Sequence, residues 1–494
     1  MLRGKNTKVV LPAIMMIMLM PCIMIGAERL SSKNATQLVI SKVVVEAITD
    51  TQAKVYWLSD IPGTSCVEYG TMSGKYDYKS KVDTLPRVAH LIELSGLKKG
   101  TKYYFRVCTK DIFGKTHVSN EQTFTTLKSF TKRGWIYYVS PSGSDANDGL
   151  TEKAAWKTLS HAASKVKPGD TVRILPGKYD GFVIQVSGTD IAPITFEGYN
   201  GKPFIAGKGI LFKKNTSYVN LKNLKVTSSG VGIEAEYGNH INIENCEVLN
   251  TKSVGIYIGD LQYVSIHKCN IHHNGWNSLM IGVHGKGPKD SYHISITDCE
   301  IHANSKHGLI DITVHFGNKF SHHHVDIINN KLYDGWHSDA FYTHWDVRPV
   351  LRVFNLSGND IYRCNYYEID LSGLKDSYLY RNKIHDSKRN AVWTRSWYLF
   401  DNITFVENEF DKVLKLPANN HVFIRNRIKH IQMKGQNILI KDHKEPVFQV
   451  EVVDGNAIIE YTDGRKFSVN GKGSFNKYKC TKGKYTIKVS SGSK

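Results

Sequence analysis

Histidine, aromatic and carboxylate side chains concentrate in one stretch of this chain. Of its 21 histidines, 13 fall between His267 and His344, and five of its eight tryptophans lie in or just after that stretch. Carboxylates can donate or remove a proton or hold a divalent cation, and histidine can move a proton near neutral pH. Tryptophan and tyrosine offer flat faces on which sugar rings can stack. These residue types predict acid–base chemistry on a carbohydrate.

A short repeated motif predicts the scaffold that would hold these side chains. The pattern aliphatic-x-x-(Asn or Cys)-x-aliphatic occurs eight times, at spacings of 18 to 31 residues, which are typical of a solenoid. One unit cannot bury its own apolar face, so the copies must stack, with the Asn or Cys marking a bend where side chains stack from coil to coil. We call this position the rung; it is held by Cys246, Cys269, Cys299, Asn330, Asn359, Asn382, Asn408 and Asn426, and by Leu224 in a degenerate ninth copy.

A second strand after each rung would carry the chemistry. Alternation with a period of two predicts which of its side chains face outward, and successive coils lie ~4.8 Å apart. The longest rung spacings fall between Cys269 and Asn359, which predicts loops on the binding side. The expected outward rows are Asp311, Tyr342, Glu368 and Trp393, then Thr313, His344, Asp370 and Arg395.

The region before the repeats has a different pattern, with short strands and polar turns over residues ~37–127. Leu97 to Val107 resembles the "tyrosine corner" strand of fibronectin type III domains, with Tyr103 as the corner residue. The resemblance makes the strands carrying Cys66 and Cys108 neighbours, and so implies a disulfide in an oxidising compartment. Such modules are commonly spacers or adhesion units.

Residues 135–180 resemble the entry into secreted right-handed parallel β-helix proteins of the pectate-lyase-like superfamily. Trp135 to Leu150 and Pro168 to Gly177 carry the resemblance, and the apolar spacing of Thr158 to Val166 predicts a helix covering the first coil. The predicted fold is all-β: a right-handed parallel β-helix (solenoid) preceded by a fibronectin type III-like β-sandwich. Its parts are a sandwich at 37–127, a linker at 128–134, a β-helix with an N-terminal helix cap at 135–440, and a C-terminal β cap or small β domain at 441–494.

The N-terminus predicts export. A basic start precedes the apolar stretch Val9 to Ala27, so residues 1–27 are expected to be a signal peptide or, alternatively, a membrane anchor. Membrane contact is expected only through that segment. For an exported chain, the net charge of +20 favours an acidic polysaccharide or cell-surface glycan over nucleic acid as partner. We expect a secreted or cell-surface monomer.

The leading prediction is a polysaccharide lyase on an extended acidic glycan. In β-elimination a base removes the proton α to a uronate carboxylate, and that carboxylate must be neutralised. The segment from Asp334 to His344 looks like the His-x-Asp-(Gly/Ala) turn on the active face of such enzymes. The resemblance also implies Ca²⁺ held by carboxylates. The candidates are His344, Arg395, Asp339 and Asp311 for catalysis, Tyr342, Trp393, Trp397, His337 and His315 for substrate, and Asp346, Glu368 and Asp370 for Ca²⁺.

Two alternatives stay open. The chain departs from the pectate-lyase-like family in lacking an Asp-Asp-x-x-Asp calcium cluster and an outward lysine beside the carboxylates, which weighs against a lyase. The first alternative is a glycoside hydrolase on the same fold, with two of Asp311, Asp339, Glu368 and Asp370 as acid and base. The fibronectin-like module and the basic charge fit a non-catalytic surface adhesin. Composition gives neither the sugar nor the linkage.

Overall fold

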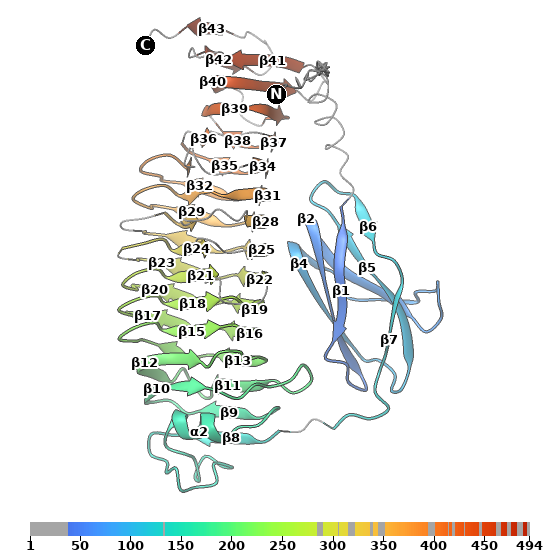
Figure 1. The fold of residues 1–494 in the computed structure, drawn as a ribbon, viewed down its shortest axis with the longest axis vertical. Coiled ribbons are helices and arrows are strands. Elements are labelled where there is room, and N and C mark those ends of the chain that lie inside the picture. The colour runs from blue at the N-terminus through green and yellow to red at the C-terminus, as the bar shows by residue number, and fades with distance from the viewer. Residues whose placement is uncertain are drawn as a thin grey trace, which may run out of the picture. The chain divides into compact units, whose positions relative to one another are not determined.

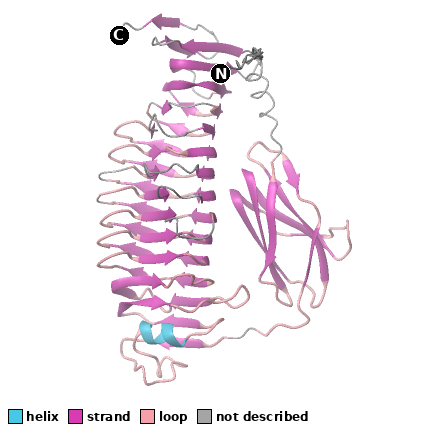
Figure 2. Cartoon of the chain, in the orientation of Figure 1, coloured by secondary structure: helices cyan, strands magenta, loops and turns pink. Residues whose placement is uncertain are grey.

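The computed structural model describes residues 38–494 apart from short gaps (Figure 2). The gaps are 132–133, 284–289, 305, 315–321, 336–338, 344–350, 394–400, 413, 417–419, 429, 444–446, 461–465, 472–475, 482–487 and 492–494. The expected signal segment, 1–27, lies outside the described residues. In the described part, no helix is both long and apolar enough to cross a membrane.

The first domain is an antiparallel β-sandwich. β2 pairs with β1, β3, β4 and β5, and β5 also pairs with β6 and β7. Trp57 and Phe105 fill its core with no exposed area. The strands are β1 (Ile40–Glu46), β2 (Gln52–Gly70), β3 (Tyr78–Lys79), β4 (Asp83–Ser95), β5 (Lys102–Lys110), β6 (Thr116–Val118) and β7 (Gln122–Thr125).

Two details of the sandwich agree with the sequence analysis. The Tyr103 hydroxyl accepts the backbone N–H of Lys98 at 2.8 Å, which is the bond that defines a tyrosine corner. Cys66 and Cys108 lie directly opposite each other on β2 and β5 and form a disulfide, as expected.

The β-helix begins with β8 (Ile136–Val139), followed by α2 (Leu159–Lys165) and β9 (Thr171–Ile174). Thr158 caps α2 by accepting the N–H of His161, and Leu159, Ala162 and Ala163 are buried. The helix therefore lies against the first coil where the apolar spacing placed it. Asp145 in the preceding turn accepts three hydrogen bonds from Lys157 and Thr158, so this Asx-rich loop is held by its own backbone and side chains.

Each later coil contributes strands to three parallel stacks (Figure 1). The stack before the rung contains β11 (Ile194–Gly198), β13 (Val219–Lys222), β16 (Asn239–Glu244), β19 (Gln262–His267), β22 (Ser291–Thr297), β25 (His322–Ile328), β28 (Leu351–Ser357), β31 (Leu374–Tyr380), β34 (Asp401–Val406) and β37 (Val422–Ile424). The stack after the rung contains β14 (Lys225–Val226), β17 (Glu247–Leu249), β20 (Asn270–His272), β23 (Glu300–His302), β26 (Lys331–Tyr333), β29 (Asp360–Tyr362), β32 (Lys383–His385), β35 (Glu409–Phe410) and β38 (Arg427–Ile428).

The third stack carries the expected chemistry. Its strands are β10 (Lys178–Ile184), β12 (Phe204–Phe212), β15 (Ile233–Glu236), β18 (Ile256–Gly259), β21 (Leu279–Val283), β24 (Ile310–Val314), β27 (Phe341–Thr343), β30 (Ile369–Asp370), β33 (Val392–Trp393), β36 (Leu414–Leu416) and β39 (His430–Lys441). Inward side chains of all three stacks form one continuous apolar core. At the C-terminal end, β40 (Val447–Glu460) pairs in parallel with β39. Antiparallel strands β41 (Lys466–Gly471), β42 (Asn476–Thr481) and β43 (Lys488–Ser491) follow it.

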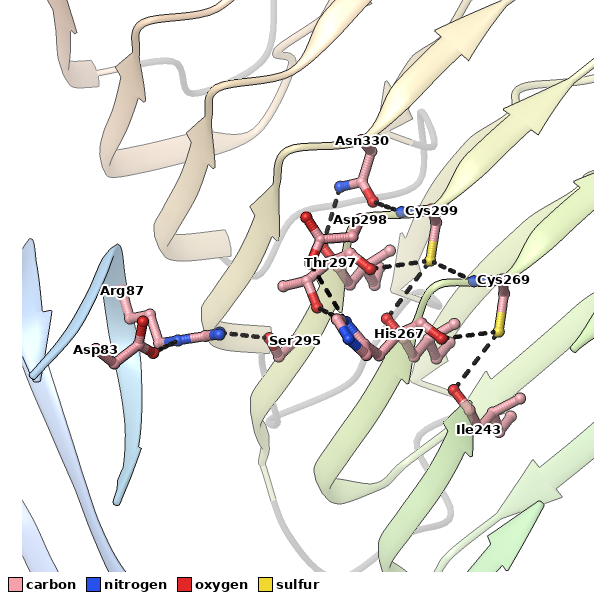
Figure 3. A network of polar contacts seen from close by, with 12 residues as sticks. Asp83, Arg87, Ile243, His267, Cys269, Ser295, Thr297, Asp298, Cys299 and Asn330 are labelled. Atoms are coloured by element: carbon pink, nitrogen blue, oxygen red, sulfur yellow. Dashed lines mark hydrogen bonds and ion pairs between the residues drawn. The ribbon is translucent and has the colours of Figure 1, made fainter. Parts of the chain in front are cut away.

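The rung is a buried hydrogen-bond ladder, as the repeat predicted. The Oδ1 of Asn330 accepts the N–H of Cys299 at 2.9 Å, and the Oδ1 of Asn359 accepts the N–H of Asn330 at 2.9 Å. The ladder continues through Asn382, Asn408 and Asn426. At Cys269 and Cys299 weak contacts of the sulfur atoms take the place of the amide (Figure 3). Each rung thus satisfies backbone groups that an apolar bend would leave buried and unpaired.

The residue before each rung adopts the left-handed conformation. Examples are Lys268 (φ 54°), Asp298 (φ 54°) and Arg381 (φ 53°), and only one of the eight, Gly358, is a glycine. A non-glycine residue pays a steric cost in this region. We infer that the rung hydrogen bonds offset that cost once in every coil.

Replacing Asn359 by alanine should destabilise the β-helix by about 3 kcal/mol. The substitution leaves the N–H of Asn330 and the carbonyl of Ile327 buried without their partner, at ~1–3 kcal/mol each. Chemical denaturation followed by circular dichroism measures the change. Cys299→Ala at the same position is the matched control, with an expected loss of about 1 kcal/mol because a thiol makes only weak hydrogen bonds. Equal losses in the two variants would contradict a ladder built on amides.

Candidate functional site

One outward row on the third stack carries the candidate residues. Strand pairing places Asp311 opposite Tyr342, and Asp370 opposite Trp393. Phe341 pairs with Ile369, so Tyr342 and Asp370 are the next outward residues of neighbouring coils. The observed row is Met280, Asp311, Tyr342, Asp370 and Trp393.

The expected position of Glu368 in this row was wrong. β30 begins at Ile369, so Glu368 lies in the preceding turn, where strand alternation no longer decides which way a side chain faces. Its neighbours in the adjacent coils are Ala340 and Ala391, and its exposed fraction is 0%. Asp370, expected in the second row, takes the place in the first row that the sequence analysis gave to Glu368. Thr313 lies on β24, two residues beyond Asp311.

Asp311 is a buried carboxyl group with one hydrogen bond. Its exposed fraction is 3%, and its Oδ2 accepts the Asn277 amide at 2.8 Å. Its Oδ1 is buried and has no hydrogen-bond partner among the residues that the structure describes. Burial raises the pKa of Asp311 to about 7, against the opposing effect of Asn277, and the negative charge of Asp370 adds to the rise. Asp311 can therefore hold a proton near neutral pH.

Asp370 has a different environment in the same row. Its exposed fraction is 0%, and its Oδ1 accepts both the N–H of Ser372 at 2.9 Å and the hydroxyl of Ser372 at 2.5 Å. Both donors belong to Ser372, so this oxygen acts as a hydrogen-bond acceptor. The row therefore contains two carboxyl groups in unlike surroundings, the arrangement that separates an acid from a base.

Glu368 and Asp339 lie beside this row, in the turns that precede the strands. Glu368 Oε1 accepts the N–H of Cys364 at 3.1 Å, while its Oε2 is buried and has no hydrogen-bond partner within the described part of the chain. Burial raises the pKa of Glu368 to about 7. Asp339 is 5% exposed and accepts the N–H of Tyr367 at 2.8 Å. Both carboxyl groups hold turn backbone, so they support the site from within the corner.

Aromatic rings lie next to the carboxyl groups. Tyr342 is half-buried between Asp311 and Asp370 in the row. The Trp393 indole stacks on the Tyr367 ring with centroids 4.7 Å apart and planes at 4°. A carboxyl row lined by flat apolar rings can hold a sugar ring against a proton donor.

Several predicted site residues cannot be placed. His344, Arg395, Asp346, Trp397, His337 and His315 lie outside the described residues. In the part that the structure describes, no group of three or more His, Cys, Asp or Glu side chains could hold a metal ion. Two of the residues expected to hold Ca²⁺ are described by the structure. Glu368 lies in the turn before β30, and Asp370 lies in the outward row.

The sequence analysis missed four residues that shape the site. Asn277 binds Asp311, Ser372 binds Asp370, Cys364 binds Glu368, and Tyr367 binds Asp339. All four lie in turns or just beyond a strand, where strand alternation does not predict the direction in which a side chain points. The sequence did offer one signal for these contacts, which is nearness in the chain. Three of the four residues lie within four positions of Glu368 or Asp370.

Family models match both domains. Residues 137–308 match the family described as Pel9A-like, right handed beta helix region. Residues 41–126 match the N-terminal domain of purple acid phosphatase, a fibronectin-like fold. The chain is a right-handed parallel β-helix protein with an N-terminal fibronectin-like β domain. The predicted fold class is thereby confirmed.

Curated relatives match only over part of this chain. An uncharacterized protein, YwoF, of Bacillus subtilis is 45% identical over 79 residues, which cover 16% of this chain and 17% of that protein. Lacto-N-biosidase of Bifidobacterium longum is 29% identical over 158 residues, which cover 24% of this chain and 10% of the enzyme. The chain thus spans less than a fifth of the length of these relatives.

Solved structures share the fold at low identity. Pectate lyase Pel9A is 16% identical with a TM-score of 0.35, covering 61% of this chain and 75% of that one. A family 28 exopolygalacturonase of Yersinia enterocolitica is 11% identical with a TM-score of 0.41, covering 87% of this chain and 100% of that one. Such neighbours are polysaccharide lyases and hydrolases.

Asp311→Asn should change how stability depends on pH. The pKa of Asp311 is raised in the folded state, so the native protein holds a proton that the unfolded chain releases, and stability is lost as pH rises from about 4 to about 7. The variant should remove that loss, and so be more stable than the wild type at pH 8 by on the order of 2–4 kcal/mol, with little difference at pH 4. Denaturant unfolding at both pH values measures it. A difference of the same size at pH 4 would contradict the pKa assignment.

Proposed function

We propose that this protein is an exported carbohydrate-active enzyme that cleaves an extended acidic polysaccharide. The observation that carries the proposal is the outward row in which Asp311 and Asp370 flank Tyr342. The fold, shared with polysaccharide lyases and hydrolases, supports the substrate class, and the net charge of +20 supports an acidic chain.

Hydrolysis is the reaction that the described carboxyl groups support best. Asp311, with its pKa near 7, can protonate the glycosidic oxygen as general acid. In this proposal Asp370 takes a proton from a water molecule as general base, and the two bonds from Ser372 hold its carboxyl group in place. Because the two carboxyl groups have different surroundings, one could act as acid and the other as base at the same pH.

The coil spacing predicts the stereochemistry. Asp311 and Asp370 are two coils apart, so their backbones are separated by about 10 Å. Inverting glycosidases place their two carboxyl groups ~6.5–9.5 Å apart to leave room for water, whereas retaining enzymes place them at ~5 Å. The backbone separation is about twice the carboxyl separation of a retaining pair, so hydrolysis on this row should proceed with inversion.

A second candidate reaction is β-elimination, which the Pel9A-like family match favours. It requires a base beside the uronate α-carbon and a group that neutralises the uronate carboxylate. His344 or Arg395 would serve as base in this proposal. A protonated Asp311 could donate a hydrogen bond to the substrate carboxylate. Ca²⁺ held with Asp346 would belong to this reaction alone.

A screen on polyuronates distinguishes hydrolysis, β-elimination and glycan binding without reaction. We expect new reducing ends without near-ultraviolet absorbance, and a loss of activity of at least a hundredfold in Asp311→Asn and in Asp370→Asn. Asp386→Asn, an exposed carboxylate on the neighbouring face, is the control and should retain activity. An unsaturated product would establish elimination instead. Glycan binding without any product, unchanged in both variants, would establish the adhesin and overturn the enzyme.

The pH dependence of kcat tests the acid. Because Asp311 must be protonated to donate, kcat should fall as pH rises above about 7. Initial rates of reducing-end release between pH 5 and pH 9 measure the profile. A rate that stays constant up to pH 9 would rule out Asp311 as the general acid.

A further inference from the structure

Two strongly exposed aromatic rings lie on the turns that lead into the third stack. Trp276 is 47% exposed and Tyr366 is 45% exposed, high values for side chains of this size. Trp276 is three residues before Leu279, and Tyr366 is three residues before Ile369. Leu279 and Ile369 occupy the same position in the coil repeat, so the two rings lie on one line parallel to the β-helix axis.

The same line carries two further flat groups. His307 and Arg389 are three residues before Ile310 and Val392, so they occupy this position in their own coils. The His307 ring stacks on Trp276 with centroids 4.1 Å apart. The Arg389 guanidinium lies 4.2 Å from the Tyr366 ring centroid. We call Trp276, His307, Tyr366 and Arg389, with the flanking Lys306 and Lys388, the aromatic–cationic ridge.

The stacking leaves ring faces open to solvent. Trp276 has His307 on one side, while the residue before it in the stack is Ser253, whose carbonyl accepts the Trp276 N–H and whose side chain is too small to cover an indole. Burial and then the charge of Lys306 lower the pKa of His307, which favours the neutral ring as a flat support. An exposed aromatic face held rigid by a neighbour costs little entropy when a sugar ring stacks on it.

The cations of the ridge have no acidic partner in the part of the chain that the structure describes. Lys306, Lys388 and Arg389 are exposed, and within the described residues none of them forms an ion pair with a carboxylate. On the other two stacks of the β-helix, outward cations pair with a carboxylate of the next coil, as in Lys222–Glu244 at 2.9 Å and Lys225–Glu247 at 2.9 Å. A row of uncompensated positive charge attracts a polyanion.

The ridge is continuous with the carboxyl row. Tyr367 follows Tyr366 directly, donates its N–H to Asp339, and stacks its ring on Trp393. A chain bound along the ridge would therefore lie alongside Asp311 and Asp370. From Trp276 to Arg389 the ridge spans four coil steps, about 19 Å.

We propose that the aromatic–cationic ridge is the binding subsite that selects a polyuronate chain and aligns it parallel to the β-helix axis. The proposal rests on the proposed function for its substrate class. Sugar rings stack on Trp276 and Tyr366, and uronate carboxylates pair with Lys306, Lys388 and Arg389. The ridge supplies affinity and direction, and the carboxyl row supplies chemistry.

Binding assays without turnover test the ridge. In an Asp311→Asn background, titration calorimetry is run with polygalacturonate, alginate and hyaluronan, and with highly methyl-esterified pectin as the uncharged counterpart of the first. We expect one polyuronate to bind, with the affinity falling about tenfold in Trp276→Ala and about tenfold in the double variant Lys306→Gln, Arg389→Gln. The double variant should also weaken the dependence of affinity on salt, because fewer charges are screened.

Matched surface changes serve as controls. Trp135→Ala removes an indole that is 64% exposed at the start of the β-helix, and Lys331→Gln removes an exposed cation on the stack after the rung. Both should bind as the parent does, and all variants should unfold at the parent's temperature. Binding unchanged in the ridge variants, equal binding of the methyl-esterified chain, or no binding of any polyuronate would each overturn the proposal.

Cleavage assays on the same panel separate this proposal from the enzymatic one. Ridge-dependent binding without cleavage by the wild type would overturn the proposed reaction and leave the ridge as a glycan site. Cleavage that depends on Asp311 but is indifferent to Trp276 and Arg389 would overturn the ridge and leave the reaction.

Discussion

Coil-to-coil stacking is the constraint on which the rest of this molecule depends, and the buried rung ladder is what locks it. From Cys246 onward, each coil must place its rung amide or thiol against the backbone of the preceding coil, or polar groups would be left unpaired in the core. A slip of one residue would turn every inward side chain outward. The ladder therefore fixes not only stability but also which side chains share a row on the surface.

Function follows from this fixed register. Asp311 and Asp370 are far apart in the chain, yet two coil steps bring them to either side of Tyr342. Burial gives Asp311 a raised pKa, while Ser372 gives Asp370 two hydrogen bonds. The same register lines up the ridge three residues earlier in each coil, so one repeat positions both the groups that could react and the groups that could hold a chain. A solenoid suits an extended substrate because its surface repeats at a constant interval.

Much of the fold could be predicted from sequence because its signals are local and repeated. The rung residues, the tyrosine corner at Tyr103 and the apolar spacing of α2 each report a contact that recurs in a known geometry. The site was harder to predict because it depends on where a strand begins. Glu368 and Asp370 are both acidic and are two residues apart, so strand alternation assigns both to the same face. Only Asp370, however, lies on β30. Turn residues such as Asn277 and Tyr367 have no periodicity, so pattern analysis could not assign their contacts. Nor could it separate the open rings of Trp276 and Tyr366 from core aromatics.

The central claim is that the register places a proton-bearing Asp311 two coils from Asp370, whose carboxyl oxygen is held by Ser372. The most direct measurement is a ¹³C NMR titration of the protein labelled at aspartate carboxyl carbons, with Asp311 assigned by its absence in Asp311→Asn. This account predicts a pKa near 7 for Asp311 that falls when Asp370 is replaced by asparagine, because a neighbouring negative charge is removed. A pKa near 4 for Asp311, unchanged by that replacement, would contradict it.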